Sequence, residues 1–219
     1  MDARPLAPDD LPAVVEVVVA AFADYPYWRW LVTDADERAH TMRSYYRADL
    51  GPLLPTSWGI DDDEGGLRAV AVWARSDAWP GFGGDSTAVA GLAAPRMVRA
   101  LAAMDATAHG EAHWYLDVLA ARPADQGMGA GGKVLTAGLR RADADGLGCY
   151  LETGKEANLD FYRHHGFAAC GETTVEDLDG RWSDGPRTAG PGAATTGDGA
   201  LHLWGMWRPP DVPPERDHL

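Results

Sequence analysis

Residues 113–132 read His113-Trp-Tyr-Leu-Asp-Val-Leu-Ala-Ala-Arg-Pro-Ala-Asp-Gln-Gly-Met-Gly-Ala-Gly-Gly132. The first half is rich in aromatic and aliphatic residues, which predicts a strand over residues 112–121 that ends before Pro123. The second half is rich in glycine and leads into an amphipathic segment that predicts a helix over residues 131–145. Glycines let backbone N–H groups approach a ligand, and a helix N-terminus carries about half a positive charge. The stretch therefore predicts an anion-binding loop or, alternatively, a plain glycine-rich turn.

The spacing of the glycines excludes two common nucleotide-binding motifs. The loop lacks the Gly-Lys-Ser/Thr ending of a P-loop. A dinucleotide-binding fingerprint needs GxGxxG near the start of a βαβ unit, with an acidic residue about twenty positions later. The pattern that is present instead is Gln126-x-x-Gly129-x-Gly131.

Composition limits the class of protein. The chain has 219 residues, 46% of them hydrophobic, which suits one domain with one substantial core. A formal charge of −14 argues against nucleic acid or an anionic membrane as the main partner and favours a cationic one. The two cysteines, Cys149 and Cys170, show no metal-ligand spacing, and the apolar stretch 13–22 is too short to span a bilayer. We therefore expect a cytoplasmic protein that binds no metal, no membrane and no nucleic acid.

Hydrophobic periodicity predicts alternating helices and strands in a single domain over residues 1–208. Asp9 and Asp10 are expected to cap the first helix, and the aromatic run from Tyr25 to Trp30 is expected to separate it from the second. Helices are predicted over 11–22, 36–50, 95–108, 131–145 and 157–165, and strands over 58–61, 67–74, 112–121, 148–152, 167–175 and 200–207. Loops are expected over 80–91 and, as a flexible excursion, over 179–199, with a frayed tail over 209–219. The predicted fold class is α/β of the α+β type.

A second motif lies downstream, at Leu151-Glu-Thr153, Asn158-Leu-Asp-Phe-Tyr162 and Gly166-Phe167. Together with the glycine loop, it resembles the GNAT superfamily of acyl-CoA-dependent N-acyltransferases, which has the loop pattern Q/R-x-x-G-x-G/A and the signature L-E-T/A, N-x-x-F-Y and G-F. The resemblance extends from the first predicted helix to the last predicted strand. It implies a mixed, mostly antiparallel sheet that splits between the cofactor strand and its neighbour, with helices on both faces.

The resemblance implies that acetyl-CoA binds at this split as the acyl donor. The main chain of residues 119–121 would pair with the pantetheine arm, and the pyrophosphate would lie over the backbone of residues 127–132, with Arg122 or Lys133 as charge partners. Asn158 would hydrogen-bond the same molecule. The cofactor-binding residues implied in this way are Leu119, Ala120, Ala121, Gln126, Gly127, Met128, Gly129, Ala130, Gly131, Gly132, Asn158 and Tyr162.

The chemistry of amide formation suggests the catalytic residues. An amine is mostly protonated at neutral pH, so a base must remove a proton before it attacks. Glu152 is the first candidate, because it ends the strand across the split, and Asp117 and His113 follow; the alternative for Glu152 is a buried carboxylate that orients the loop. The resemblance places Tyr162 beside the cofactor sulfur, where a phenol of ordinary pKa can protonate the departing thiolate, and the alternative is a packed helical aromatic. The backbone N–H of Leu119 is a candidate donor to the thioester oxygen.

Within the superfamily, the sequence resembles puromycin N-acetyltransferase and related actinomycete antibiotic acetyltransferases. The likeness rests on residues 20–26, 69–73 and 114–116 and on the motif from Leu151 to Tyr162, whereas residues 119–122 depart from it. It implies that the segment joining the first two helices lines the acceptor pocket, with aromatic walls that suit a flat amine. The implied substrate-binding residues are Tyr25, Tyr27, Trp28 and Trp30, for which core packing is the alternative.

The predicted function is transfer of an acetyl group from acetyl-CoA to a primary amine of a small molecule, such as an antibiotic or a nucleoside-like metabolite, by direct attack. One alternative is another acyl donor, either a carrier protein or an aminoacyl-tRNA, and the acidic charge disfavours the tRNA. The other is a non-catalytic sensor of acyl-CoA, which the retained Asn158 and Tyr162 disfavour. A monomer or a homodimer is expected.

Overall fold

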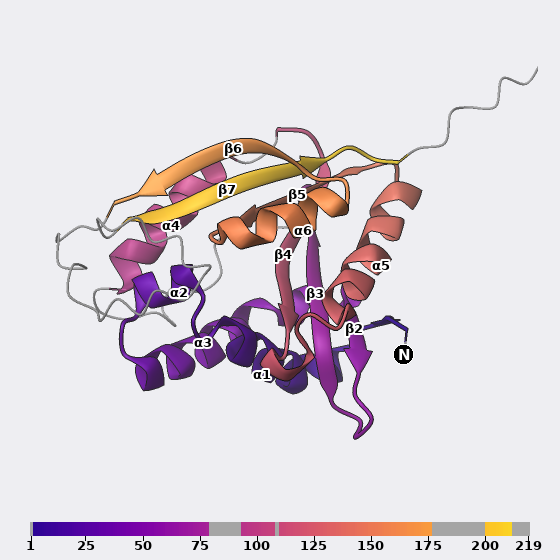
Figure 1. Cartoon of the computed structure of the whole chain (residues 1–219), viewed down its shortest axis with the longest axis horizontal. Coiled ribbons are helices and arrows are strands. Elements are labelled where there is room, and N and C mark those ends of the chain that lie inside the picture. Colours follow the sequence, from indigo (N-terminus) through magenta and orange to yellow (C-terminus); the bar gives the residue numbers. More distant parts are fainter. Residues whose placement is uncertain (1, 79–92, 108–109, 177–199, 212–219) are drawn as a thin grey trace, which may run out of the picture.

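A seven-stranded sheet forms the centre of the molecule in the computed structural model, which describes residues 2–78, 93–107, 110–176 and 200–211 (Figure 1). The strands are β1 (Arg4–Pro5), β2 (Trp58–Asp61), β3 (Leu67–Arg75), β4 (His113–Ala121), β5 (Gly148–Thr153), β6 (Ala168–Val175) and β7 (Leu201–Arg208). Their order is β1-β2-β3-β4-β5-β7-β6, and the pairs are antiparallel except for β4 and β5. The predicted mixed, mostly antiparallel sheet is confirmed. The two-residue strand β1 was not predicted, because it is too short to show a period.

The sheet splits between β4 and β5. These parallel strands pair only from His113 to Tyr115, against Gly148 to Tyr150. Beyond that point β4 stays paired with β3 as far as Ala121, while β5 stays paired with β7 as far as Thr153. In the described ladders, the edge of β4 that faces β5 therefore has no strand partner over its second half. The predicted split is confirmed.

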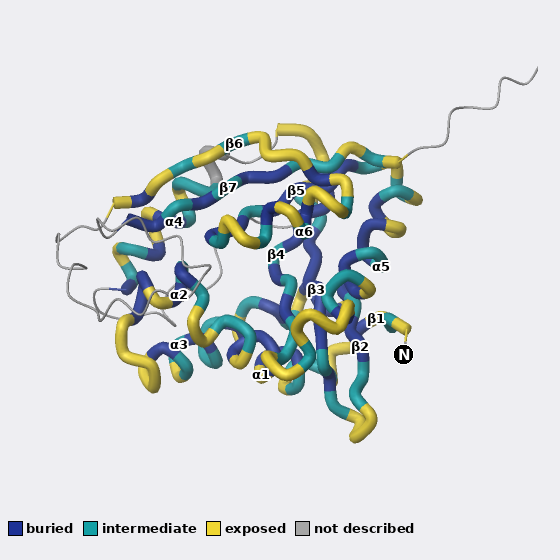
Figure 2. The backbone as a smooth tube through the Cα atoms, in the orientation of Figure 1, coloured by how far each residue is buried: buried dark blue, intermediate teal, exposed yellow. Residues whose placement is uncertain are grey.

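Helices cover both faces of the sheet, as predicted (Figures 1 and 2). They are α1 (Leu11–Phe22), α2 (Pro26–Leu31), α3 (Ala35–Asp49), α4 (Ala93–Thr107), α5 (Ala130–Ala144) and α6 (Leu159–His164). The helices α1 to α4 share one apolar core with one face of the sheet, and α5 and α6 share a second core with the other face. Short 3-10 turns lie at Pro8–Asp10, Gly51–Thr56, Pro123–Asp125 and Glu156–Asn158.

The first helix begins differently from the sequence expectation. Asp10 is the N-cap residue of α1, but its side chain makes no capping bond to that helix. Its Oδ2 atom instead accepts from the backbone N–H of Ala7 at 2.8 Å, and both carboxylate oxygens accept from Arg4. The reason is the 3-10 turn that precedes α1, because this turn places Asp10 at its end rather than at a free helix start.

The short helix α2 occupies the aromatic run that was expected to be a break. A helix of six residues is not stable alone and depends on its surroundings. The buried side chain of Arg38, on α3, stabilises α2 through hydrogen bonds to the segments beside it. Its Nε donates to the carbonyl of Ala23 at 2.8 Å, and its Nη1 donates to the carbonyls of Val32 and Thr33 at 2.8 and 2.9 Å. One guanidinium thus holds the segments on both sides of α2.

Helix α5 packs closely on β2, β3 and β4. The contact depends on Gly138, because a Cβ atom there would lie 2.2 Å from Nε1 of Trp73 on β3. Real Cβ atoms do not approach other heavy atoms this closely, so glycine is required at the crossing. Buried Val134, Leu135 and Leu139 form the apolar face beside it, as the predicted amphipathic pattern requires.

Several expectations lie outside the described residues, namely the loops at 80–91 and 179–199 and the tail from residue 212 on. Residues 209–211 are described and have no regular secondary structure. Within the described parts, no helix combines the length and hydrophobicity that crossing a bilayer requires.

Candidate functional site

A β-bulge in β4 marks the point where the sheet splits. Val72 of β3 pairs with Val118 and the next residue, Trp73, pairs with Leu116, so Asp117 is an extra residue in β4. A bulge bends its strand and redirects the side chain at that position. Here it places Asp117 beside the gap between β4 and β5, where it lines a cavity.

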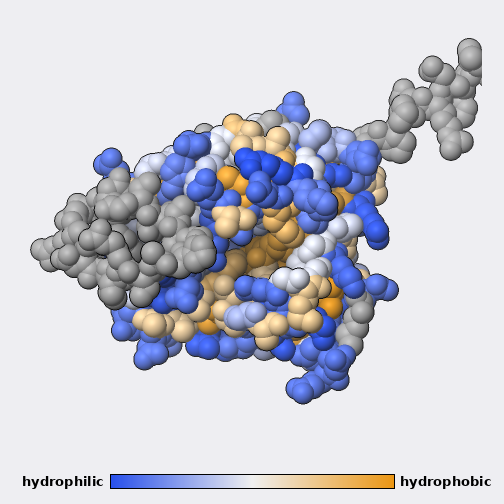
Figure 3. All heavy atoms as spheres, in the orientation of Figure 1, coloured by the Kyte–Doolittle hydropathy of each residue, from blue (hydrophilic) through white to orange (hydrophobic). Residues whose placement is uncertain are grey.

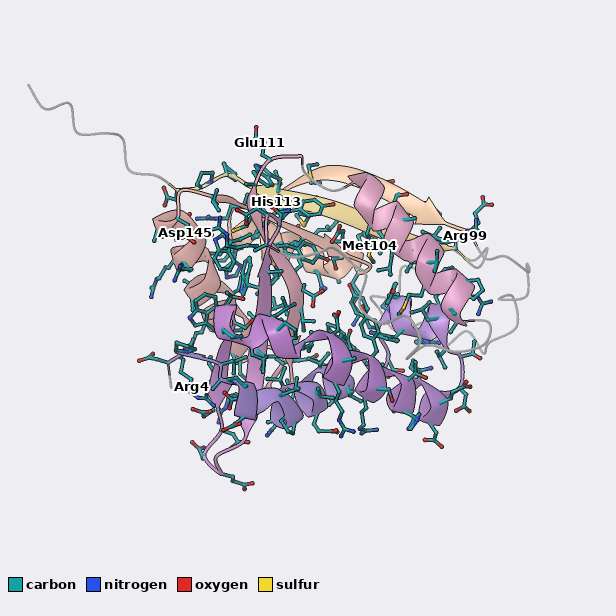
Figure 4. All side chains as sticks on the ribbon, turned by 180° about the vertical axis from the view of Figure 1, so that it is seen from behind. Arg4, Arg99, Met104, Glu111, His113 and Asp145 are labelled. Atoms are coloured by element: carbon teal, nitrogen blue, oxygen red, sulfur yellow. The ribbon has the colours of Figure 1, made fainter. Side chains whose placement is uncertain are left out.

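This cavity, which we call the acidic cavity, has a volume of about 120 Å³. Its walls come from α1 to α4, from β4, β5 and β7, and from α6. Among the described residues, its carboxyl groups are those of Asp117 and Glu152, and most of the remaining wall is aromatic or aliphatic. Figure 4 shows Met104 on the inner side of α4, where it joins this wall, and Arg99 on the outer side. On the face shown in Figure 3, an apolar hollow lies between hydrophilic rims near the middle of the molecule.

Glu152 is held in place by a neighbouring phenol. The Tyr115 hydroxyl donates to Glu152 Oε2 at 2.8 Å, while Oε1 is buried and has no hydrogen-bond partner in the described part of the chain. Burial raises the pKa of Glu152 from 4.5 to about 7, although hydrogen bonds from Tyr115 and Tyr150 oppose the shift. A carboxyl group with such a pKa can accept a proton near neutral pH.

Asp117 has two acidic neighbours, Asp49 and Glu152. Burial raises its pKa well above the usual range, and the nearby carboxyl groups of Asp49 and Glu152 raise it further. Its Oδ2 atom is buried without a hydrogen-bond partner among the described residues. Asp49, at the end of α3, also has a raised pKa because it is buried.

Three of the four predicted acceptor residues line the acidic cavity, namely Tyr25, Tyr27 and Trp28. Tyr25 also organises the end of β5, because its hydroxyl accepts from the backbone N–H of Gly154 at 2.8 Å and lies 3.3 Å from Thr153 Oγ1. The fourth residue, Trp30, is buried in the core outside the lining of this cavity.

Sequence reasoning missed other parts of the aromatic wall. Tyr45 and Tyr46 of α3 line the acidic cavity, and Trp28 Nε1 donates to the Tyr46 hydroxyl at 2.8 Å. Their helical spacing matches a core-facing stripe, which cannot be told from a cavity wall by periodicity alone. Phe22 lies in the same wall and stacks on Tyr25 with ring centroids 5.0 Å apart.

A second cavity of about 430 Å³, the glycine-loop cavity, lies between the free edge of β4 and the start of α5. Gly127 and Gly129 have φ angles of +76° and +83°, in a region that other residues rarely adopt. These turns bring the loop round to the N-terminus of α5, where the first backbone N–H groups of a helix have no partner within the helix. The geometry suits a phosphate group.

Nearly all of the predicted cofactor-binding residues line the glycine-loop cavity. They are Leu119, Ala120, Ala121, Gln126, Gly127, Gly129, Ala130, Gly131, Gly132, Asn158 and Tyr162. Met128 is the exception, with 71% of its surface exposed. Gln126 donates from Nε2 to the carbonyl of Ala121 at 3.1 Å, so its side chain ties the loop to the end of β4.

The cations near this cavity differ from those expected. Arg122 is engaged elsewhere, because its Nη1 contacts Asp62 Oδ2 at 2.6 Å in the β2–β3 turn. Neither Arg122 nor Lys133 is part of the lining, whereas Lys155, which the sequence reasoning missed, is. Its Nζ lies 5.4 Å from the centre of the Tyr25 ring.

Tyr162 stands at the junction of the two cavities. Five of the described residues line both of them, namely Phe22, Tyr25, Leu119, Asn158 and Tyr162. Asn158 Nδ2 donates to Thr153 Oγ1 at 3.2 Å, which fixes its position there. The expectation of an ordinary pKa for Tyr162 is wrong, because burial raises the pKa of this phenol. The hydroxyl consequently keeps its proton at neutral pH.

His113 is remote from both cavities. Figure 4 shows it at the start of β4, near Glu111, whose carbonyl lies 2.6 Å from His113 Nδ1. It is buried and its ring contacts Tyr150 and Trp207. In the described ranges, no group of three or more His, Cys, Asp or Glu side chains is arranged to hold a metal ion.

Comparison with known proteins identifies related sequences and folds. Residues 22–167 match the model of the acetyltransferase (GNAT) family. This range includes the bulged strand, the glycine loop and the motif that carries Glu152 and Tyr162.

Solved structures share the fold over almost the whole chain. An acetyltransferase from Corynebacterium glutamicum, described as histone acetyltransferase HPA2 and related acetyltransferase, is 23% identical with a TM-score of 0.61, and the match covers 97% of this chain and 98% of that one. The arylalkylamine N-acetyltransferase like 5b of a mosquito is 13% identical with a TM-score of 0.65 and coverage of 94% and 98%. The PaiA N-acetyltransferase of Thermoplasma acidophilum, in complex with coenzyme A, is 12% identical with a TM-score of 0.53 and coverage of 95% and 98%.

Proposed function

Because the chain belongs to the GNAT acetyltransferase family, we propose that it transfers an acetyl group from acetyl-CoA to a primary amine of a small molecule. The observation that carries this proposal is the junction of the two cavities at Tyr162. The glycine-loop cavity suits the phosphates of a donor, the acidic cavity suits a cationic acceptor, and the shared wall is where the two can meet.

The residues of the glycine-loop cavity fit acetyl-CoA. Acetyl-CoA supplies an acetyl group activated as a thioester. The unpaired edge of β4 offers backbone groups to an extended arm, with the Leu119 N–H as the candidate donor to the thioester oxygen, and the glycine loop offers N–H groups to a pyrophosphate. Binding through backbone dipoles lets a chain of formal charge −14 hold a polyanion without a basic patch.

Glu152 and Tyr162 divide the proton transfers between them. Glu152 removes a proton from the ammonium through its free Oε1, while Tyr115 keeps the carboxylate in position. The amine nitrogen then forms the new C–N bond as the C–S bond breaks, and the Tyr162 hydroxyl gives its proton to the sulfur. The second proton that the nitrogen loses on becoming an amide returns to the Tyr162 phenolate. Asp117 remains the second candidate base, because it lines the same cavity.

The acceptor is proposed to enter the acidic cavity with its amine-bearing end first. The aromatic wall around Tyr27 and Trp28 suits a flat or cationic group. The resemblance to antibiotic acetyltransferases makes nucleoside-like antibiotics, aminoglycosides and amino-acid derivatives the first acceptors to test. Such an activity would serve resistance or biosynthesis in the cytoplasm.

Two measurements test the proposal. The change in unfolding temperature on adding acetyl-CoA, a longer acyl-CoA or RNA identifies the donor class. We expect acetyl-CoA to stabilise the protein. Release of free thiol in the presence of an amine panel then identifies the acceptor. Stabilisation by none of the acyl-CoAs would refute the proposal, and binding of acetyl-CoA without acetylation of any amine would point to a sensor.

A further inference from the structure

The acidic cavity contains a second buried carboxyl group, for which one amine does not account. In the proposed function, the reacting amine takes Glu152 as its base, and Asp117 then still has Oδ2 buried without a hydrogen-bond partner in the described residues. A buried polar atom without a partner is costly, so native structures seldom keep one unless a ligand or water satisfies it.

The neighbours of Asp117 add negative charge. Among the described residues, the charged groups that act on it are the carboxyls of Asp49 and Glu152, and their effect is to disfavour its ionised form. The β-bulge nevertheless leaves Asp117 without a pairing partner in β3, and its side chain lines the cavity. A cation in the cavity would allow Asp117 and Glu152 to be ionised together.

The aromatic part of the cavity wall also suits a cation. The rings of Tyr27, Trp28, Tyr45 and Tyr46 form one contact cluster, with centroids 5.3 to 5.6 Å apart between neighbours. All four line the acidic cavity, and aromatic faces attract ammonium groups in desolvated sites. The cavity of about 120 Å³ is compact, since an engineered cavity of about 150 Å³ holds one benzene ring.

We propose that the acceptor carries two ammonium groups a short distance apart, with the reacting amine at Glu152 and the second ammonium bound by Asp117 within the aromatic wall. The acceptor is then a diamine, or a larger molecule with a diamine end. This inference rests on the proposed function and specifies its substrate.

The test compares three acceptors of matched length: putrescine, 4-aminobutanol and pentylamine. They differ only in whether the distal end is an ammonium, a hydroxyl or a methyl group. With acetyl-CoA as donor, we expect kcat/KM per amine to be at least about tenfold higher for putrescine than for the other two, as a hydrogen bond to a charged group contributes about 1.5 to 3 kcal/mol. Equal values of kcat/KM for the three acceptors, or a preference for pentylamine or for an arylalkylamine, would overturn the inference.

Asp117→Asn identifies the binding group. This variant should reduce the ratio of kcat/KM for putrescine to kcat/KM for aminobutanol to about one. A loss of turnover that both acceptors share does not affect this ratio. Asp36→Asn removes the same charge from an exposed site on α3 and should leave that ratio as in the unmodified protein. If both variants change the ratio equally, the preference comes from net charge and the assignment to Asp117 is wrong.

Thermal stabilisation by each acceptor, without acetyl-CoA, gives a readout that needs no turnover and no variant. Putrescine should stabilise the unmodified protein more than aminobutanol does. If monoamines are acetylated as well as putrescine, this inference fails and the proposed function stands. If acetyl-CoA binds and no amine is acetylated, the proposed function fails. The rise in unfolding temperature that each amine causes still decides whether the cavity binds a dication.

Discussion

At the scale of single residues, the pKa of Glu152 has two measurable consequences. As a base it must be ionised, so we expect kcat/KM to rise with pH through a midpoint near its pKa of about 7. Glu152→Gln should remove this limb and lower kcat/KM by about a hundredfold or more. A pH profile that keeps the same midpoint in the variant would exclude Glu152 as the base.

The Glu152 carboxyl should also lower the free energy of unfolding at high pH. Its pKa is 4.5 in the reference state and about 7 in the folded protein, so the folded chain keeps a proton that the unfolded chain loses as pH rises between these values. The stability of the fold therefore decreases over this window and stays lower above it, by about 3 kcal/mol. Urea unfolding should show Glu152→Gln more stable than the unmodified protein above pH 7, with little difference near pH 4. Glu64→Gln, at an exposed turn position, serves as the control without this pH dependence.

Tyr162→Phe separates the acid role from packing. The phenylalanine ring keeps the contacts with Phe161 and Phe167, so the fold and the glycine-loop cavity should be preserved. We expect kcat to fall by about a hundredfold while the affinity for acetyl-CoA, measured by calorimetry, stays within a few-fold. Unchanged turnover would remove Tyr162 from the role of proton donor.

Sequence patterns located some of these residues but not their surroundings. Glu152 and Tyr162 lie in a motif, so a linear pattern was enough to select them. Asp49 and Lys155 carry no such signal, because their positions beside the two cavities depend on how α3 and the end of β5 pack. The pKa of Tyr162 likewise depends on burial, which the sequence alone does not give.

At the scale of elements, the glycine loop should respond to alanine in a position-dependent way. Gly129 is the N-cap of α5 with φ of +83°, and a Cβ there meets no atom within 4 Å. The cost of Gly129→Ala is therefore conformational, about 1 to 2 kcal/mol. Gly131→Ala, in the first turn of α5 and also free of steric contact, should be neutral or stabilising by up to about 1 kcal/mol. Thermal unfolding of both variants checks the opposite signs; equal losses would mean that the backbone angle of Gly129 is not the cause.

Periodicity predicted the long elements well and the short ones poorly. The five predicted helices and six predicted strands are present, with ends that differ by a few residues. Helix α2 and strand β1 escaped prediction because their stability comes from distant groups, the guanidinium of Arg38 in one case and pairing with β2 in the other. The prediction that the sheet splits rested on the family resemblance, since no local sequence pattern encodes where two strands separate.

At the scale of the whole molecule, the formal charge of −14 predicts a preference among acceptors. An acidic exterior raises the local concentration of cations, and salt weakens this effect because the screening length falls from about 10 Å at 0.1 M to about 3 Å at 1 M. An amino-acid amide, which is cationic, should therefore be a better acceptor than the zwitterionic free amino acid. Increasing sodium chloride should narrow the difference in initial rate between the amide and the free amino acid by up to about tenfold. A difference that does not change with salt would assign the preference to contacts within the cavity alone.

The contact between Gly138 and Trp73 sets a distance on which the donor site depends. Since the backbone of α5 lies directly against the indole of Trp73 on β3, this side chain fixes how closely the helix approaches the sheet. The glycine loop enters this helix and also borders the edge of β4, so the same ring determines the width of the opening between them. Any side chain at position 138 would act as a spacer that widens this opening from more than one helical turn away, without touching the ligand.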